Sequence, residues 1–168
     1  TGPSSASVTV GTATSLGDFT VTDPFVCGWN TMTATVSIPD GKGSLTATAS
    51  GSATISGSGT RTLTITGTMS ELNTVLDTVA VSASVSGSVD VTTNVVPAIR
   101  FTSGGVTYHL NKSNGHYYSV IETLRSWNDA QMDAKSRTFC GSKGYLAAID
   151  NAAEQEFIES EALNQIGR

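Results

Sequence analysis

The stretch GTRTLTITGTMSELNTVLDTVAVSAS, residues 59–84, contains two different hydrophobic periods. Leu63 and Ile65 alternate with threonines, which predicts a strand with one buried face. The following segment, Ser70–Val79, places four apolar residues on one side of a helix, and Ser70 is the predicted N-cap. Alternation then resumes over 79–85. The stretch therefore predicts a strand, a short helix that crosses between two sheets, and a second strand.

The same alternation occurs elsewhere in the first part of the chain. Apolar residues occupy every second position over Met32–Ile38, and the positions between them are serine or threonine. Glycine-containing turns at 40–43, 57–59 and 87–88 separate such runs. Residues 1–97 hold 36 serines and threonines but only 8 charged residues. We therefore expect residues 1–97 to form a two-sheet antiparallel β-sandwich whose solvent face is rich in hydroxyls.

The composition changes at Val96-Pro97, where we place a domain boundary. Three aromatic residues precede this point and eight follow it. In residues 98–168, a strand is expected over 117–121 and a buried strand over 144–149. Two helices are also expected. The first is capped by Ser126 and buries Trp127, Ala130, Ala134 and Thr138; the second is capped by Asp150 or Asn151 and points Phe157 and Ile158 inward.

Both parts resemble known families. Residues 5–96, with the 59–84 stretch, resemble the cadherin-like or Ig-like repeats of bacterial surface adhesins. The run HYYSVIETLRSWNDAQMDAKSRTFCGSKGYLAAIDNAAEQEFI, residues 116–158, resembles the first half of a C-type lectin-like domain, and its Cys140 lies in a loop like that of bacterial members. The resemblance implies an all-β sandwich followed by an α+β C-type lectin-like domain, of which 98–168 is an incomplete, N-terminal portion.

These resemblances imply a binding function. The expected protein is an extracellular, cell-surface adhesin of bacterial type, in which 1–97 is a spacer and the lectin-like domain binds a glycan or a protein. The alternative is a purely structural pair of connector modules with no ligand of their own. A third reading, an enzyme, is not favoured because no nucleophile motif or zinc spacing is found.

Calcium is the one cofactor that the resemblance implies. Adhesin repeats often place acidic calcium ligands between modules, and Asp18 and Asp23 occupy such a stretch, although Phe25 stands where a further acid would help. The sugar-binding lectins also hold calcium with a Trp-Asn-Asp triplet on a late strand. Here that triplet, residues 127–129, opens a helix, so its Trp127 is expected in the core. Any ligand site of the lectin-like domain is expected outside residues 1–168.

The two cysteines, Cys27 and Cys140, are an even pair in a chain of extracellular character. Such a pair favours a disulfide, which here would join the two modules. Pairing with cysteines elsewhere in a longer chain, or two free thiols, are the alternatives, because a bridge needs Cα atoms within about 7 Å.

Charge and hydropathy exclude two classes of partner. The net charge is −5, with 9 basic and 14 acidic residues and no basic cluster, so a nucleic-acid partner is not expected. No apolar run reaches the length of a membrane span.

His109 and His116 flank a turn and are predicted to be structural, and the acidic residues of 154–161 are predicted to form a charged helix surface. Asn111-Lys112-Ser113 is a glycosylation sequon.

Overall fold

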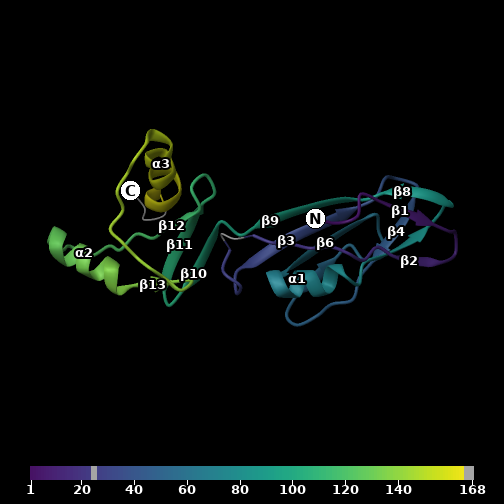
Figure 1. Ribbon diagram of the computed structural model, residues 1–168, viewed down its shortest axis with the longest axis horizontal. Helices are drawn as coiled ribbons and strands as arrows, with labels where there is room; N and C mark the ends of the chain where they lie inside the picture. Colours follow the sequence, from purple (N-terminus) through teal and green to yellow (C-terminus); the bar gives the residue numbers. More distant parts are fainter. Residues whose placement is uncertain (24–25, 165–168) are drawn as a thin grey trace. The chain divides into compact units, whose positions relative to one another are not determined.

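The computed structural model describes residues 1–23 and 26–164 and is mostly β-sheet with three short α-helices (Figure 1). Its contacts divide the chain into two compact units, Thr1–Ala98 and Ile99–Arg168. The division falls one residue after the boundary expected from composition. The mixture of sheet and helix agrees with the coarse expectation of a β-rich chain with an α+β part.

The described residues of the first unit form three antiparallel sheets. A four-stranded sheet has the order β5 (Thr54–Ser56), β6 (Thr62–Thr68), β3 (Thr31–Ser37), β9 (Thr92–Pro97). A three-stranded sheet has the order β2 (Ala13–Ser15), β7 (Ala80–Ala83), β4 (Gly43–Thr46), and β1 (Ser5–Val8) pairs with β8 (Gly87–Asp90). The expected turn at 87–88 is thus the start of a strand.

The alternation predicted for the first unit is confirmed by burial. Met32, Ala34 and Val36 of β3 are at most 2% exposed, and they share one core cluster with Leu45 and Val81 of the three-stranded sheet. The other face of β3 carries hydroxyl side chains that are half-buried or exposed. The four-stranded and three-stranded sheets therefore contribute to a single hydrophobic core and keep their hydroxyls on the outside.

The predicted helix is present as α1 (Met69–Leu76), which follows β6 of one sheet and precedes β7 of the other. Its N-cap is Thr68 and not Ser70, so that prediction was wrong by two residues. Thr68 Oγ1 accepts from the Glu71 N–H, and the Glu71 carboxylate accepts from the Thr68 N–H at 2.9 Å, which completes a capping box. Leu72, Val75 and Leu76 are fully buried.

The capping box makes the first unit sensitive to acid. The Glu71 carboxylate accepts hydrogen bonds from the N–H groups of Thr68 and Ser52, which lower its pKa from 4.5 to about 2. Because the folded pKa is depressed, this contribution to stability is complete above pH 4.5 and is lost as the pH falls towards 2. We expect Glu71→Gln to make the free energy of unfolding, measured with urea, depend less on pH between 4.5 and 2. Asp90→Asn, at an exposed acid of the same unit, is the control that removes one negative charge without touching the capping box.

The second unit contains a small sheet, two helices and a β-hairpin. Strands β10 (Arg100–Ser103), β11 (Val106–Asn111) and β12 (His116–Tyr118) form an antiparallel sheet in that order. Helix α2 (Trp127–Ser136) precedes the pair β13 (Thr138–Phe139) and β14 (Ser142–Lys143). Helix α3 (Ala152–Phe157) continues into a π-helical turn, η1 (Ile158–Leu163).

Two expected starts of helices are confirmed in this unit, but the expected burial is not. Ser126 caps α2 and Asn151 caps α3. Trp127, however, is 64% exposed, and α2 buries none of its residues, so its expected core face is absent. Thr138 lies beyond the helix in β13. The segment 144–149 is not a strand because, in the described part of the chain, no sheet pairs with its backbone; Ile149 is 48% exposed.

Four aromatic rings form the centre of the second unit. Phe139 stacks on Tyr108 with ring centroids 4.0 Å apart and on Phe101 at 5.2 Å, and it meets Tyr117 edge-on at 4.9 Å. Such contacts add to the burial of each ring. The cluster joins the hairpin β13–β14 to the sheet. Its four rings are half-buried, and few apolar residues in the described part of this unit are fully buried.

Candidate functional site

The two acids predicted to bind calcium lie in one loop of the first unit. Asp18 has a left-handed backbone, with φ of 58°, and Asp23 lines a cavity that does not include Asp18. Phe25 lies outside the described residues. Within residues 1–23 and 26–164, no group of three or more histidine, cysteine or acidic side chains is placed to hold a metal. Calcium at Asp18 and Asp23 stays a prediction.

The two cysteines lie in different units. Cys27 is in the loop before β3, and Cys140 is at the turn between β13 and β14 with φ of 51°. Their predicted disulfide stays a prediction. We expect the intact mass to rise by about two hydrogens on reduction if the bond is closed. An unchanged mass would contradict the disulfide, and release of a second species on reduction would indicate other partners.

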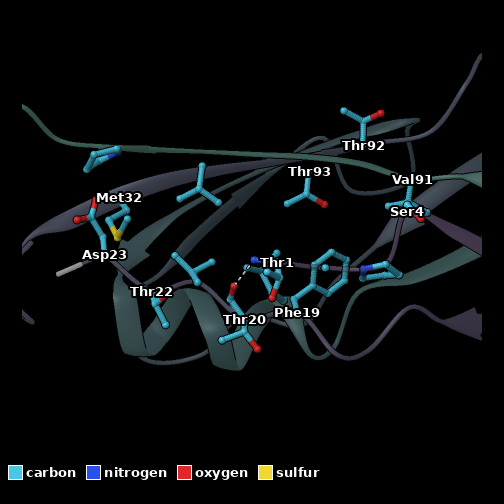
Figure 2. A pocket seen from close by; sticks show the side chains of 16 residues that line it. Thr1, Ser4, Phe19, Thr20, Thr22, Asp23, Met32, Val91, Thr92 and Thr93 are labelled. Carbon is cyan, nitrogen blue, oxygen red and sulfur yellow. Dashed lines mark hydrogen bonds between the residues drawn. The ribbon is translucent and has the colours of Figure 1, made fainter. Parts of the chain in front are cut away.

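The first unit contains a cavity of about 540 Å³ (Figure 2). It lies where the chain passes from β8, which pairs with β1, through Val91 to β9, which pairs with β3. Figure 2 shows Thr93 on one side of the cavity and Thr1 and Phe19 on the other. Its volume falls in the range of small-ligand sites.

Hydrogen bonds hold the wall opposite β9. Thr1 and Thr20 exchange two backbone bonds, of 2.6 and 2.8 Å. The Asn73 side chain of α1 accepts from the Val21 N–H at 2.7 Å and donates to the Val21 carbonyl at 3.1 Å. The cavity is therefore a gap between two hydrogen-bonded walls, and its lining contains one charged side chain, that of Asp23, besides the amino terminus.

Thr93 is the unusual residue of this cavity. It pairs with Val36, a fully buried residue of the neighbouring strand, so its side chain points to the inner side of the sheet. Its Oγ1 atom is buried and has no hydrogen-bond partner among residues 1–23 and 26–164. A buried hydroxyl without a partner costs free energy relative to water.

Replacing this hydroxyl should stabilise the first unit. We expect Thr93→Val, which exchanges the hydroxyl for a methyl of the same size, to raise the free energy of unfolding by about 1 kcal/mol. The measurement is urea unfolding, with Thr35→Val on the outer face of β3 as the matched control. A loss of stability would mean that water in the cavity bonds the hydroxyl.

The second unit has a buried polar pair. The Tyr118 hydroxyl of β12 donates to Glu154 Oε1 of α3, and the Asp150 N–H donates to the other oxygen, Oε2, at 3.1 Å. Burial and the bond to Glu154 raise the pKa of Tyr118 to about 12, whereas the bond from Tyr118 lowers the pKa of Glu154. Glu154 is only 6% exposed, so the predicted charged surface was wrong at this position. The pair fastens α3 to the sheet.

The two histidines have different environments. His109 is 4% exposed in β11, and burial, followed by the charge of Arg100, lowers its pKa. His116 is exposed at the start of β12, where its Nδ1 lies 3.2 Å from the Tyr145 hydroxyl. Both flank the turn between β11 and β12, as expected, and their side chains have structural neighbours.

The sequon asparagine is unsuited to modification in the folded chain. Asn111 is 4% exposed, and its Oδ1 accepts from the N–H of Ser113 at 3.0 Å and from its hydroxyl at 2.6 Å. The Nδ2 atom, to which a glycan would be attached, is buried. The side chain therefore shapes the turn.

Large apolar side chains are exposed in the second unit. They lie in α2, in the segment before it and in the segment between β14 and α3: Leu124, Trp127, Met132, Tyr145, Leu146 and Ile149, with exposed fractions from 37% to 103%. A folded soluble domain rarely leaves so many large apolar residues in water. This unit therefore has apolar surface that its own described residues do not cover.

Comparisons with protein-family models, with curated proteins and with solved structures found no match to this chain. No helix of the described residues has both the length and the apolar character needed to cross a membrane.

Sequence reasoning missed Thr93 and the Tyr118–Glu154 pair. The alternation over residues 92–97 was a usable signal for Thr93, because it places 93, 95 and 97 on one face of a strand. No comparable signal predicted the bond of Tyr118 to Glu154, since 36 positions separate the two residues.

Proposed function

We propose that this chain is part of an extracellular surface protein of the bacterial adhesin type. The first unit is a spacer with an Ig-like or cadherin-like sandwich, and the second unit is the N-terminal portion of a C-type lectin-like domain that binds a glycan or a protein. Binding, and not catalysis, is the activity.

The exposed apolar residues of the second unit carry this proposal. Trp127, Tyr145 and Ile149 belong to the segments whose order resembles the lectin-like family, and each is at least 48% exposed. A complete lectin-like domain would cover them with its remaining strands. The capped starts of α2 and α3, at Ser126 and Asn151, also follow the expected order.

The surface chemistry of the first unit supports the role of a spacer. The outer face of β3 and β6 pairs Thr33 with Thr66 and Thr35 with Thr64, and the Thr33 and Thr66 hydroxyls lie 3.1 Å apart. Such a face is hydrated without charge, and the core behind it is continuous. A module of this kind needs no ligand in order to fold.

The test uses an array of immobilised glycans and proteins. The longer surface protein that we propose contains this chain is applied to the array, once with calcium and once with EDTA. We expect binding to one class of glycan or protein, and loss of binding when the lectin-like domain is deleted. Calcium-dependent binding would also support the calcium prediction. Absence of binding under both conditions would favour the alternative, a connector without a ligand.

A further inference from the structure

The turn between β11 and β12 contains the pair Asn114-Gly115. Asn114 is exposed, and Gly115 has a left-handed backbone with φ of 73°. An asparagine that precedes a glycine can lose its side-chain amide without an enzyme, because a residue without a Cβ does not hinder its own backbone nitrogen. The turn therefore exposes a reactive side chain to water.

Hydrogen bonds position the two groups that would react. Asn114 Oδ1 accepts from the His116 N–H at 2.9 Å, and this bond would stabilise negative charge that develops on Oδ1 during attack at Cγ. The Gly115 N–H donates to the Asn111 carbonyl at 2.8 Å and must leave it before the nitrogen reacts. Residues 112–114 of the turn are exposed, and local opening of such a segment costs little free energy.

The amide of Asn114 belongs to a chain of hydrogen bonds. Its Nδ2 donates to the Tyr118 hydroxyl at 3.0 Å, and that hydroxyl donates its one proton to Glu154 Oε1. A carboxylate at position 114 would have no proton to donate and would compete with Glu154 for the proton of Tyr118. It would also add a second negative charge close to the Glu154 carboxylate.

The bond from Tyr118 to Glu154 is a link between β12 and α3. Glu154 is 6% exposed, and the Tyr118 ring centroid lies 5.6 Å from that of Phe157 at the end of the helix. In the described residues, α3 has six residues, so contacts with the sheet contribute much of what holds it in place. Competition for the Tyr118 proton should therefore let α3 open more often.

We propose that Asn114 is a site of spontaneous deamidation, and that the carboxylate formed there loosens α3 from the sheet. The Gly115 nitrogen loses its proton and attacks Asn114 Cγ. The new N–Cγ bond replaces the Cγ–Nδ2 bond, and Nδ2 leaves as ammonia with the proton that the glycine gave up. Water then adds to one carbonyl carbon of the resulting succinimide as the bond from that carbon to the ring nitrogen breaks. The product is an aspartate or an isoaspartate, which is charged at neutral pH.

Incubation of the 168-residue chain in mildly alkaline buffer, followed by digestion with trypsin, tests the reaction. Peptide 113–125 contains one asparagine, Asn114, and peptide 126–135 contains one, Asn128. We expect peptide 113–125 to gain, with incubation time, the mass difference between an amide and an acid. Asn128 is also exposed but precedes a residue with a Cβ, so peptide 126–135 is the matched control and should not change.

Asn114→Asp tests the consequence for α3. We expect hydrogen exchange over residues 155–163 to become about tenfold faster, as the loss of one hydrogen bond to a charged group predicts. Asn128→Asp makes the same change of charge in the same unit and should leave that exchange unchanged. Asn114→Ala removes the same donor but adds no competing acceptor, so it should accelerate exchange less than Asn114→Asp does.

Any of four results would overturn the proposal. The first is an amide retained at Asn114 during an incubation that deamidates a free peptide of residues 113–118. The second is unchanged exchange over residues 155–163 in Asn114→Asp. The third is equal acceleration by Asn114→Ala, which would assign the effect to the lost bond between Oδ1 and the His116 N–H. The fourth is equal acceleration over β11 in Asn114→Asp, which would mean that the whole sheet had opened.

Discussion

Leu72→Ala is expected to lower the free energy of unfolding of the first unit by about 3 kcal/mol. Leu72 lies on α1, is fully buried, and belongs to the core cluster that both larger sheets share. Removing its side chain leaves a void between the helix and the strands, and the packed surroundings relax only in part. Urea unfolding should show a lower midpoint with an unchanged slope.

Ser70→Ala is the matched control for Leu72→Ala. Ser70 lies on the same helix two residues earlier, is exposed, and is not the N-cap. Its replacement should change the unfolding free energy by less than about 0.5 kcal/mol. Equal effects of the two substitutions would contradict the assignment of Leu72 to the core.

Phe139→Ala should lower the free energy of unfolding of the second unit by about as much as Leu72→Ala lowers that of the first. Phe139 contacts three other rings and joins the β13–β14 hairpin to the sheet of β10, β11 and β12. Loss of its ring removes both buried area and ring contacts. Together these losses should lower the free energy of unfolding by about 3 kcal/mol. Hydrogen exchange over β11 should become faster by up to about 100-fold, because opening of this sheet becomes easier.

Leu124→Ala is the control for Phe139→Ala, because Leu124 is an apolar residue of the same unit that is 103% exposed. It should leave the exchange of β11 unchanged. If Leu124→Ala also accelerated exchange, Leu124 would be covered in solution. Unchanged exchange in Phe139→Ala would show that the aromatic cluster does not hold the unit together.

The two sets of variants address the two units independently. Leu72→Ala tests whether a continuous core holds the first unit together, as a spacer requires. Phe139→Ala tests whether the aromatic cluster holds the second unit together, since many other large apolar residues of that unit are exposed. A second unit that is stable without a covering segment would weaken the proposed lectin-like portion and favour the connector alternative.

The local sequence pattern was sufficient to predict much of the structure of the first unit. The alternation at Met32–Ile38 depends only on the period of a strand, so the buried positions of β3 follow directly. The helix after Thr68 was also predictable from spacing. Its N-cap was not, because threonine and serine are both good caps, and Thr68 is selected by its reciprocal bonds with Glu71, which Ser52 also orients.

The candidate sites could not be predicted from local sequence, because they depend on contacts between residues that are far apart in the chain. The inward direction of Thr93 is set by its register with Val36, 57 positions earlier in the chain. Glu154 has a helix position that local pattern assigns to solvent, and only the hydroxyl of Tyr118 makes it a buried acceptor. Trp127 was expected in a core because of its type, although the described residues supply nothing to cover it.

The sequence by itself determined the β-rich character of the chain, the position of its change in composition, and the starts of its two later helices, because these depend on side chains a few residues apart. The tertiary structure alone decided which strands pair with β8 and with β9, and that the Thr93 hydroxyl is buried. Those features arise from contacts between strands distant in the chain, and no local period encodes them.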